Sequence, residues 1–152
     1  MQPRFDDIAI EKFTPSRLSD VATFAKKWSS DDVYDRFGSF GSAGPSWLLS
    51  SLEYGRAALL ARNLGAVVAL LDFEEQEDVI NFGIIVLAAL RRKGIGSSLL
   101  ATVLAHVNAK VTAETSCANR AANALLRRHG FTPTWLCAGE MGWEWPPAGI
   151  KR

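Results

Sequence analysis

The stretch RRKGIGSSLL, residues 91–100, lies between a strand-like apolar run and a helix-like one. Amides at a helix N-terminus have no intrahelical partners and lie at the positive end of the helix dipole, so such a turn can bind an anion. Gly94 and Gly96 remove β-carbons where a phosphate would approach, and the flanking arginines, lysine and serines add positive charge and hydroxyl donors. A tight turn with solvated cations explains the same residues equally well.

Two other glycine-rich motifs do not fit this stretch. A Walker loop needs a Lys-Ser/Thr pair directly after its last glycine, and here Gly96 is followed by Ser97-Ser98. A dinucleotide-binding fingerprint needs a third glycine, an acidic residue about 20 positions further on, and a place after a first strand. The stretch comes late in the chain instead, so neither nucleotide fold is predicted.

The rest of the chain alternates between strand and helix patterns. The predicted strands are 8–13, 56–63, 66–75, 79–86, 110–116, 132–138 and 140–145, and the predicted helices are 14–28, 33–37, 45–53, 94–109 and 119–129. Short turns join the second, third and fourth strands, which predicts antiparallel hairpins followed by a strand, helix, strand crossover. The fold class is therefore α/β with a mixed sheet, and residues 29–44 are predicted to form a lid or a wall of the substrate site.

Length and composition predict one globular domain over 1–152, with a core at about 5–146 and a frayed tail at 147–152. The formal net charge of +1 gives no broad field for nucleic acid or an acidic membrane. Cys117 and Cys137 lack metal-ligand spacing and are too few for a disulfide framework, so we expect no metal and a reducing compartment. Because the start lacks an apolar signal core and no run approaches the length of a membrane span, we expect a cytoplasmic protein.

The glycine-rich stretch resembles the signature of the GNAT family of N-acetyltransferases. That signature, Arg/Gln-x-x-Gly-x-Gly/Ala between the fourth strand and the following helix, is similar to Arg91-Arg92-Lys93-Gly94-Ile95-Gly96, and Val86 closes the preceding strand at the matching interval. A second family segment, an Asn followed by Ala, Leu and a closing Gly-Phe, resembles Asn119, Ala122, Leu125 and Gly130-Phe131. The resemblance extends over about 5–146 and is strongest over 79–131.

The resemblance implies the acyl-CoA N-acyltransferase fold, in which a mixed, mainly antiparallel sheet carries helices on both faces and strands four and five splay apart after Val86. It also implies acetyl-CoA as the cofactor. Backbone amides of 92–97 would then hold the pyrophosphate, the edge of 84–86 would pair with the pantetheine arm, and two asparagines would bond the arm or the phosphates. The implied cofactor-binding residues are Ile84, Ile85, Val86, Arg91, Arg92, Lys93, Gly94, Ile95, Gly96, Ser97, Ser98, Asn119 and Asn123.

The resemblance does not supply the catalytic residues. The family often has a tyrosine after the helix leucine as the acid for the departing thiolate, and here Leu126 follows. The carboxylate that often serves as base on the fourth strand is absent, and Asn81 can orient a water but cannot accept a proton. Glu114 on the fifth strand and Cys117 just after it are weak substitutes, because a solvated strand glutamate and a small loop residue are commoner roles. The general acid and base are therefore unknown.

Two functions remain open from the sequence. The favoured one is an N-acetyltransferase that transfers acetyl from acetyl-CoA to a primary amine, of a small molecule or a protein, by direct attack. The alternative, motivated by the missing tyrosine and strand carboxylate, is a catalytically degenerate acyl-CoA-binding sensor or regulatory module. The balanced charge disfavours a nucleic-acid binder. Residues 29–55 and 74–78, which set the acceptor in such folds, carry no known motif, and exposed late strands can pair two subunits into a homodimer.

Overall fold

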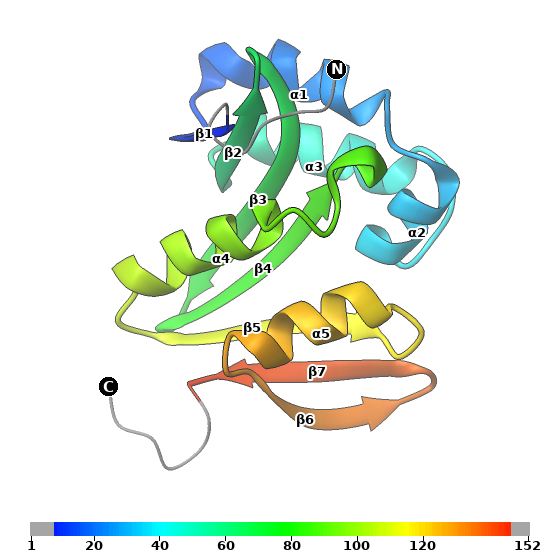
Figure 1. Ribbon diagram of the computed structural model, residues 1–152, viewed down its shortest axis with the longest axis vertical. Helices are drawn as coiled ribbons and strands as arrows, with labels where there is room; N and C mark the ends of the chain where they lie inside the picture. Colours follow the sequence, from blue (N-terminus) through cyan, green and yellow to red (C-terminus); the bar gives the residue numbers. More distant parts are fainter. Residues whose placement is uncertain (1–7, 147–152) are drawn as a thin grey trace.

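The computed structural model describes residues 8–146, so the predicted tail at 147–152 and the first residues of the predicted core lie outside the described part. Within that part, seven strands form one sheet in the order β1-β2-β3-β4-β5-β7-β6 (Figure 1). The strands are β1 (Ile8–Lys12), β2 (Ala57–Asn63), β3 (Ala66–Gln76), β4 (Val79–Val86), β5 (Lys110–Ser116), β6 (Thr132–Cys137) and β7 (Glu140–Trp145). The α-helices are α1 (Leu18–Ala25), α2 (Ser30–Phe37), α3 (Ala43–Glu53), α4 (Ile95–His106) and α5 (Arg120–Arg128).

Strands β2, β3 and β4 form consecutive antiparallel hairpins, as predicted, and β1 pairs antiparallel with β2. Strands β5, β7 and β6 form a second antiparallel group. The two groups meet at the parallel pair β4–β5, which α4 connects. The β2–β3 turn has Leu64 and Gly65 at φ 52° and 85°, and the β3–β4 turn has Glu77 and Asp78 at 53° and 63°. Positive φ at both central residues matches the twist of a two-residue hairpin. The mixed, mainly antiparallel sheet is therefore confirmed.

Helices cover both faces of the sheet, as the fold class requires. On one face, Phe24 of α1 and Leu48 of α3 pack in a buried cluster with Leu70 of β3. On the other face, Leu99 of α4 packs in a second cluster with Leu71. Because neighbouring strand residues point to opposite faces, Leu70 and Leu71 belong to different clusters. Both faces of β3 are buried, which explains why its sequence reads as a continuous apolar run.

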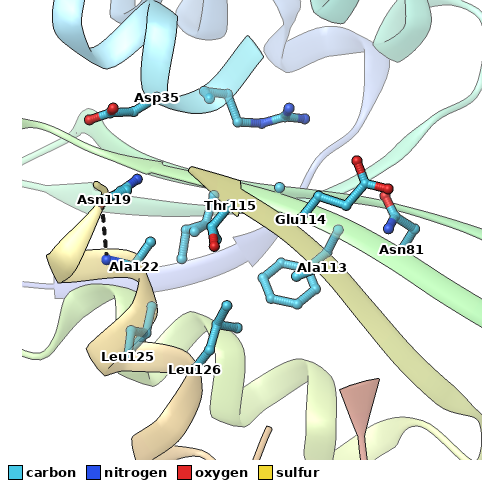
Figure 2. A pocket seen from close by; sticks show the side chains of 13 residues that line it. Asp35, Asn81, Ala113, Glu114, Thr115, Asn119, Ala122, Leu125 and Leu126 are labelled. Atoms are coloured by element: carbon cyan, nitrogen blue, oxygen red, sulfur yellow. Dashed lines mark hydrogen bonds between the residues drawn. The ribbon is translucent and has the colours of Figure 1, made fainter. Parts of the chain in front are cut away.

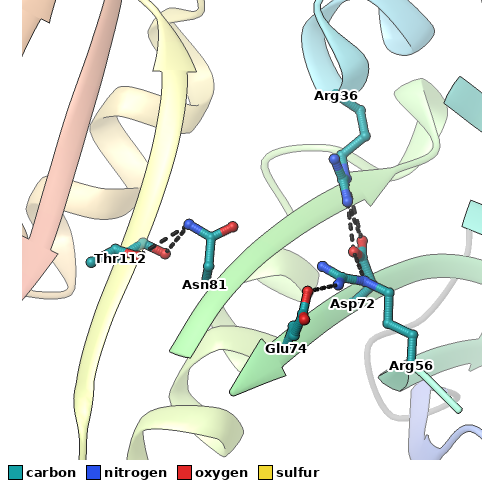
Figure 3. Close-up of polar contacts among 6 residues, drawn as sticks. All are labelled: Arg36, Arg56, Asp72, Glu74, Asn81 and Thr112. Atoms are coloured by element: carbon teal, nitrogen blue, oxygen red, sulfur yellow. Dashed lines mark hydrogen bonds and ion pairs between the residues drawn. The ribbon is translucent and has the colours of Figure 1, made fainter. Parts of the chain in front are cut away.

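The sheet opens where β4 leaves β5. The two strands pair only from Val79–Lys110 to Asn81–Thr112, although β4 continues to Val86. At the last pair, Asn81 Nδ2 donates to Thr112 Oγ1 at 3.0 Å (Figure 3). Beyond it the ribbons of β4 and β5 diverge (Figure 1). The splay that the resemblance implied is present, and it begins after Asn81, earlier than expected.

Several helix boundaries differ from the predictions: α3 begins at Ala43, before Pro45, and α4 ends at His106, before residue 109. The predicted helix 14–28 is divided into a 3-10 turn at Pro15–Arg17 and the shorter helix α1. Helix α2 begins earlier than predicted because Ser29 Oγ accepts from Asp32 N while Asp32 Oδ2 accepts from Ser29 N. This capping box satisfies two amides that the helix itself leaves without partners.

Candidate functional site

Two adjoining cavities open where β4 and β5 separate, and we call them together the splay cleft. One, of about 150 Å³, lies between β4, β5, α5 and α2 (Figure 2). The other, of about 140 Å³, lies between β4, α2, α5 and the turn that precedes α4. The side chains that border both cavities are Asp35, Arg36, Ile84, Asn119, Ala122 and Leu125. The opening in the sheet is therefore lined by groups from both of its faces.

The turn before α4 has the geometry of an anion-binding concavity. Arg92 and Gly94 take left-handed φ values of 63° and 80°, and Gly94 is the N-cap of α4. Ser98 N donates to Gly94 O at 2.9 Å, which closes the first helical turn. The amides of 95–97 lie in that turn, where a helix offers no intrahelical acceptor. Left-handed residues followed by free first-turn amides form the kind of backbone nest that binds phosphates.

Gly96 lies against side chains that line the splay cleft. A β-carbon added there would lie 3.5–3.6 Å from the side chains of Ile84, Val86 and Leu125, which is ordinary contact. Ile84 and Leu125 border both cavities of the cleft. Internal packing therefore does not demand a glycine at this position.

Past Asn81, β4 has a strand neighbour on one edge only. Its pairing with β3 continues through Ile84, Ile85 and Val86, whereas the edge toward β5 faces the splay cleft. The side chain of Ile85 belongs to the core on the α1 face, at 5% exposure, so its backbone is the part that a ligand can reach. Such an edge can pair with an extended ligand as a further strand would.

Arg91 connects the anion-binding turn to α2. Its Nη2 pairs with Asp32 Oδ1, and its Nε donates to the carbonyl oxygen of Val86 at 3.2 Å. Asp32 is buried and also forms the capping box of α2. Arg91 is therefore held by internal partners.

The side chains of Arg92 and Lys93 form no hydrogen bond or ion pair within residues 8–146, so their charges remain available at the turn.

The two asparagines near the start of α5 differ in what they contact. Asn119, the N-cap, accepts from Ala122 N at 3.2 Å, and its side chain borders both cavities (Figure 2). Asn123 is buried and accepts from Thr115 Oγ1 at 2.6 Å, and its Nδ2 donates to the carbonyl oxygens of Ser116 and Cys117, both at 3.3 Å. Asn123 lies outside the splay cleft and ties α5 to the end of β5. Of the two, Asn119 is the one placed to reach a ligand in the cleft.

The three candidate catalytic side chains lie in different surroundings. Asn81 borders the splay cleft, but its amide nitrogen is held by Thr112. Glu114 borders the cleft from β5, with an exposed carboxylate that forms no hydrogen bond or ion pair within residues 8–146. Cys117 borders a neighbouring cavity of about 460 Å³ and not the splay cleft. Leu126 lies in the cleft wall, and in the described part of the chain no tyrosine borders the cleft.

The main feature that the sequence analysis missed is a buried ion network beneath α2. Arg36 Nη2 contacts both carboxylate oxygens of Asp72, at 2.6 and 2.7 Å, and Asp72 is completely buried. Arg56 also donates to Asp72, at 2.9 Å, and to Glu74, at 3.0 Å (Figure 3). A β-carbon on Gly83 would collide with the Arg36 guanidinium. Helix α2 is thus anchored over β4 close to the start of the splay.

Asp35 of α2 also borders the splay cleft and was missed. Although the residue is exposed overall, partial burial raises the pKa of its carboxyl above 3.8; Arg91 opposes this rise, and Asp31 and Asp32 add to it.

The sequence signal that could have revealed the ion network beneath α2 was Asp72, a lone carboxylate in an apolar strand-like run, which implies a buried cationic partner. That signal does not say which arginine binds it, so it could not place α2.

A hydrogen bond joins the first turn of α4 to the end of α5. Ser97 Oγ lies 2.5 Å from Nε2 of His129, the C-cap of α5. Burial lowers the pKa of His129 below its ordinary value of 6.5, and neighbouring Arg128 lowers it further. A neutral imidazole therefore holds Ser97 beside the amides of the anion-binding turn at neutral pH.

The remaining chemistry-bearing groups are isolated from one another. Cys117 and Cys137 are free and exposed. Across residues 8–146, no group of three or more His, Cys, Asp or Glu side chains is placed to hold a metal ion. No helix in the same span is long and apolar enough to cross a membrane.

Several solved structures share this fold. The GNAT domain of PAT from S. lividans superposes with a TM-score of 0.76 at 18% sequence identity, over 90% of this chain and 88% of that one. The PaiA N-acetyltransferase from Thermoplasma acidophilum, solved in complex with coenzyme A, gives 0.73 at 14% identity, over 90% and 97%. The ribosomal-protein-S18-alanine N-acetyltransferase from Escherichia coli gives 0.68 at 15% identity, over 90% and 92%. At such low identity these similarities show the fold alone.

Sequence comparison shows the family itself. A search of curated proteins found no match. The model of the acetyltransferase (GNAT) family matches residues 18–131, which is most of the chain and includes the anion-binding turn, the free edge of β4 and α5. The resemblance predicted from the two sequence motifs is confirmed, and this chain belongs to the acetyltransferase (GNAT) family.

Proposed function

We propose that this chain is an N-acetyltransferase that moves an acetyl group from acetyl-CoA to a primary amine. The observation that carries the proposal is the backbone nest at the start of α4, which lies beside the splay cleft. A nest of amides suits a diphosphate, and a narrow cleft along a free strand edge suits a flexible amide-containing arm. The Thermoplasma structure of similar fold holds coenzyme A, which supports this choice of cofactor.

The residues of the site fit acetyl-CoA. The amides of 95–97 would bind the diphosphate, and Arg92 and Lys93 would add positive charge beside it. The free edge of 84–86 would pair with the pantetheine arm, and Asn119 would bond it from α5. Bound acetyl-CoA supplies an acetyl group activated as a thioester.

The chain's own groups would prepare that acetyl group for attack. Ile84, Leu125 and Leu126 give the cleft apolar walls, which exclude water and strengthen electrostatic contacts inside it. Amides on the free edge of β4 are the donors available to polarise a carbonyl oxygen. Because no tyrosine of residues 8–146 borders the cleft, the departing sulfur would take its proton from the acceptor nitrogen or from water.

Thiol release tests the proposal. The purified chain should free thiol from acetyl-CoA with at least one amine from a panel of polyamines, aminoglycosides, amino acids, lysine peptides and peptides with N-terminal alanine. The alanine peptides are included because one structure of similar fold is named for that reaction on a ribosomal protein. Calorimetry should show acetyl-CoA binding in parallel. A chain that neither binds acetyl-CoA nor releases thiol would end the proposal.

A second candidate is a non-catalytic acyl-CoA-binding module. Two observations favour it: the leucines in the cleft wall cannot donate a proton, and the amide nitrogen of Asn81 is occupied by Thr112. Tight binding of acetyl-CoA without thiol release on any amine of the panel would support the module. We place the enzyme first because a proton transfer usually contributes only about 10²- to 10⁴-fold to a rate and water can supply it.

A further inference from the structure

Asp35 lies where three cavities meet. It borders both cavities of the splay cleft and the neighbouring cavity of about 460 Å³, which Glu114 and Glu140 also border. Figure 2 shows Asp35 on α2, across the cleft from Leu125 and Leu126 of α5. A cofactor in the splay cleft and an acceptor in the neighbouring cavity would therefore both lie against this side chain.

Two ion pairs fix helix α2, and therefore Asp35, in place. Arg36 is fixed by the buried Asp72, and Asp32, one turn before Asp35, is fixed by Arg91. The carboxylate of Asp35 itself forms no hydrogen bond or ion pair within residues 8–146. An anchored helix therefore presents an unpaired carboxylate at the junction of the cavities.

The electrostatic surroundings suit a proton acceptor. The charged groups that face Asp35 or share its cavities are Arg91 from the turn before α4, Asp31, Asp32 and Arg36 from α2, Glu114 from β5 and Glu140 from β7. The charge of Arg36 is already matched by Asp72, so it does not neutralise Asp35. Partial burial raises the pKa of the Asp35 carboxyl, which makes the carboxylate a stronger base.

We propose that Asp35 binds the ammonium group of the acceptor and takes its proton. The inference rests on the proposed function and names the base that the sequence left unknown. Asp35 accepts one proton from the ammonium group, which frees the electron pair on nitrogen. That pair forms the N–C bond to the acetyl carbon while the C–S bond breaks, and the second proton of the nitrogen goes to the departing sulfur. Asp35 then returns its proton to solvent.

Replacement of Asp35 by asparagine tests the assignment, because it keeps the shape and removes the base. On the amines of the panel that the wild type acetylates, Asp35→Asn should lower kcat/KM by about 10²- to 10⁴-fold. Asp35→Glu should restore part of the rate. The matched control is Asp20→Asn on α1, which borders none of the three cavities and pairs with Arg62 at the surface, and it should leave kcat/KM unchanged. Acetyl-CoA affinity should stay the same in all three variants.

Carboxyl carbon-13 NMR gives a readout that needs neither the cofactor nor turnover. The signal of Asp35 is the one missing from the spectrum of Asp35→Asn. Addition of propylamine at neutral pH should move that signal, whereas 1-propanol at the same concentration and ionic strength should not. At neutral pH propylamine carries an ammonium group where 1-propanol carries a hydroxyl group. A shift of the Asp35 signal with propylamine alone therefore reports contact with the ammonium group.

The outcomes separate the two proposals. Thiol release by Asp35→Asn at the wild-type rate would overturn the inference, and so would a loss that appears in Glu114→Gln and not in Asp35→Asn. If the wild type binds acetyl-CoA but acetylates no amine of the panel, the proposed function fails. In that case the NMR measurement decides alone, and a propylamine response equal to that of 1-propanol would remove Asp35 as an ammonium-binding group.

Discussion

The two sides of the splay cleft are built in different ways. The proposed cofactor side consists mainly of backbone groups from one continuous segment, from β4 through the turn to α4, with left-handed φ values at Arg92 and Gly94. The proposed acceptor side consists of side chains from α2 and β5, and its position depends on the pairing of Arg36 with Asp72. A site made of local backbone can be read in consecutive residues, whereas a site made of distant side chains depends on the whole fold. Variants should therefore damage one side and spare the other.

The largest expected effect is on the acceptor side, at the buried ion network. Asp72→Asn leaves Arg36 and Arg56 without their shared carboxylate, and loss of one partner of a buried ion pair typically costs about 3–5 kcal/mol. Urea unfolding should show this decrease in the free energy of unfolding. Glu74→Gln removes a carboxylate that pairs with Arg56 at the surface and should cost at most about 1 kcal/mol. Equal losses in the two variants would show that the network does not anchor α2.

The next effect belongs to the cofactor side. In Gly96→Trp the indole would project toward Ile84 and Leu125 and fill the cleft beside the anion-binding turn. We expect acetyl-CoA affinity to fall by at least about 100-fold, or about 2.7 kcal/mol, in calorimetry. Ala105→Trp, at an exposed position of the same helix, is the control and should bind as the wild type does. Wild-type affinity in Gly96→Trp would show that the cofactor does not use this turn.

A smaller effect, on stability, is expected at Arg91, which joins the turn before α4 to helix α2. Arg91→Ala removes the cation that pairs with the buried Asp32 and should cost about 1–3 kcal/mol. The loss should be local, so hydrogen exchange should speed up for the amides of α2 and stay unchanged for those of β2. Uniform acceleration over the whole chain, or none in α2, would contradict the view that Arg91 couples the turn to α2.

The smallest effect concerns pH. Because the pKa of His129 is lowered in the folded protein, its contribution to stability is present above pH 6.5 and is lost as the pH falls through the folded pKa. Between pH 7.5 and 5.5, the free energy of unfolding should therefore fall more steeply for the wild type than for His129→Asn, which cannot titrate. Measurements at pH 8, where the imidazole is neutral in both states, give the baseline for each protein. Parallel slopes for the two proteins would rule out this contribution.

The sequence predicted the turn between β4 and α4 well because its determinants are local. Gly94 and Gly96 mark a turn between a strand and a helix, and the structure gives that turn left-handed residues and free first-turn amides. Apolar periodicity gave the order of the strands and helices, and the short turns at 64–65 and 77–78 gave the hairpins. The start of the splay was expected later than it occurs, because the last β4–β5 pair, at Asn81 and Thr112, depends on two strands that are far apart in the sequence.

The acceptor side could not be predicted because its determinants are far apart in the sequence. Helix α2 buries only Asp32 and Val33, so its apolar pattern was too weak to orient it. Its position depends on Arg36 reaching Asp72, which is 36 residues away. Glu114 was considered as a base because β5 is a clear strand, whereas Asp35 was not, because its place beside the cleft follows only from that distant ion pair.

Amide NMR of the nitrogen-15-labelled chain tests the central claim most directly. When coenzyme A is added, the largest shifts should fall on the amides of 95–97 and on those along 84–86, with smaller shifts in α2. An excess of inorganic diphosphate should reproduce the shifts of 95–97 alone, since it has no arm to occupy the edge of β4. Saturating coenzyme A that leaves the amides of 95–97 unmoved, or that moves residues outside the splay cleft instead, would contradict the assignment of the cofactor site.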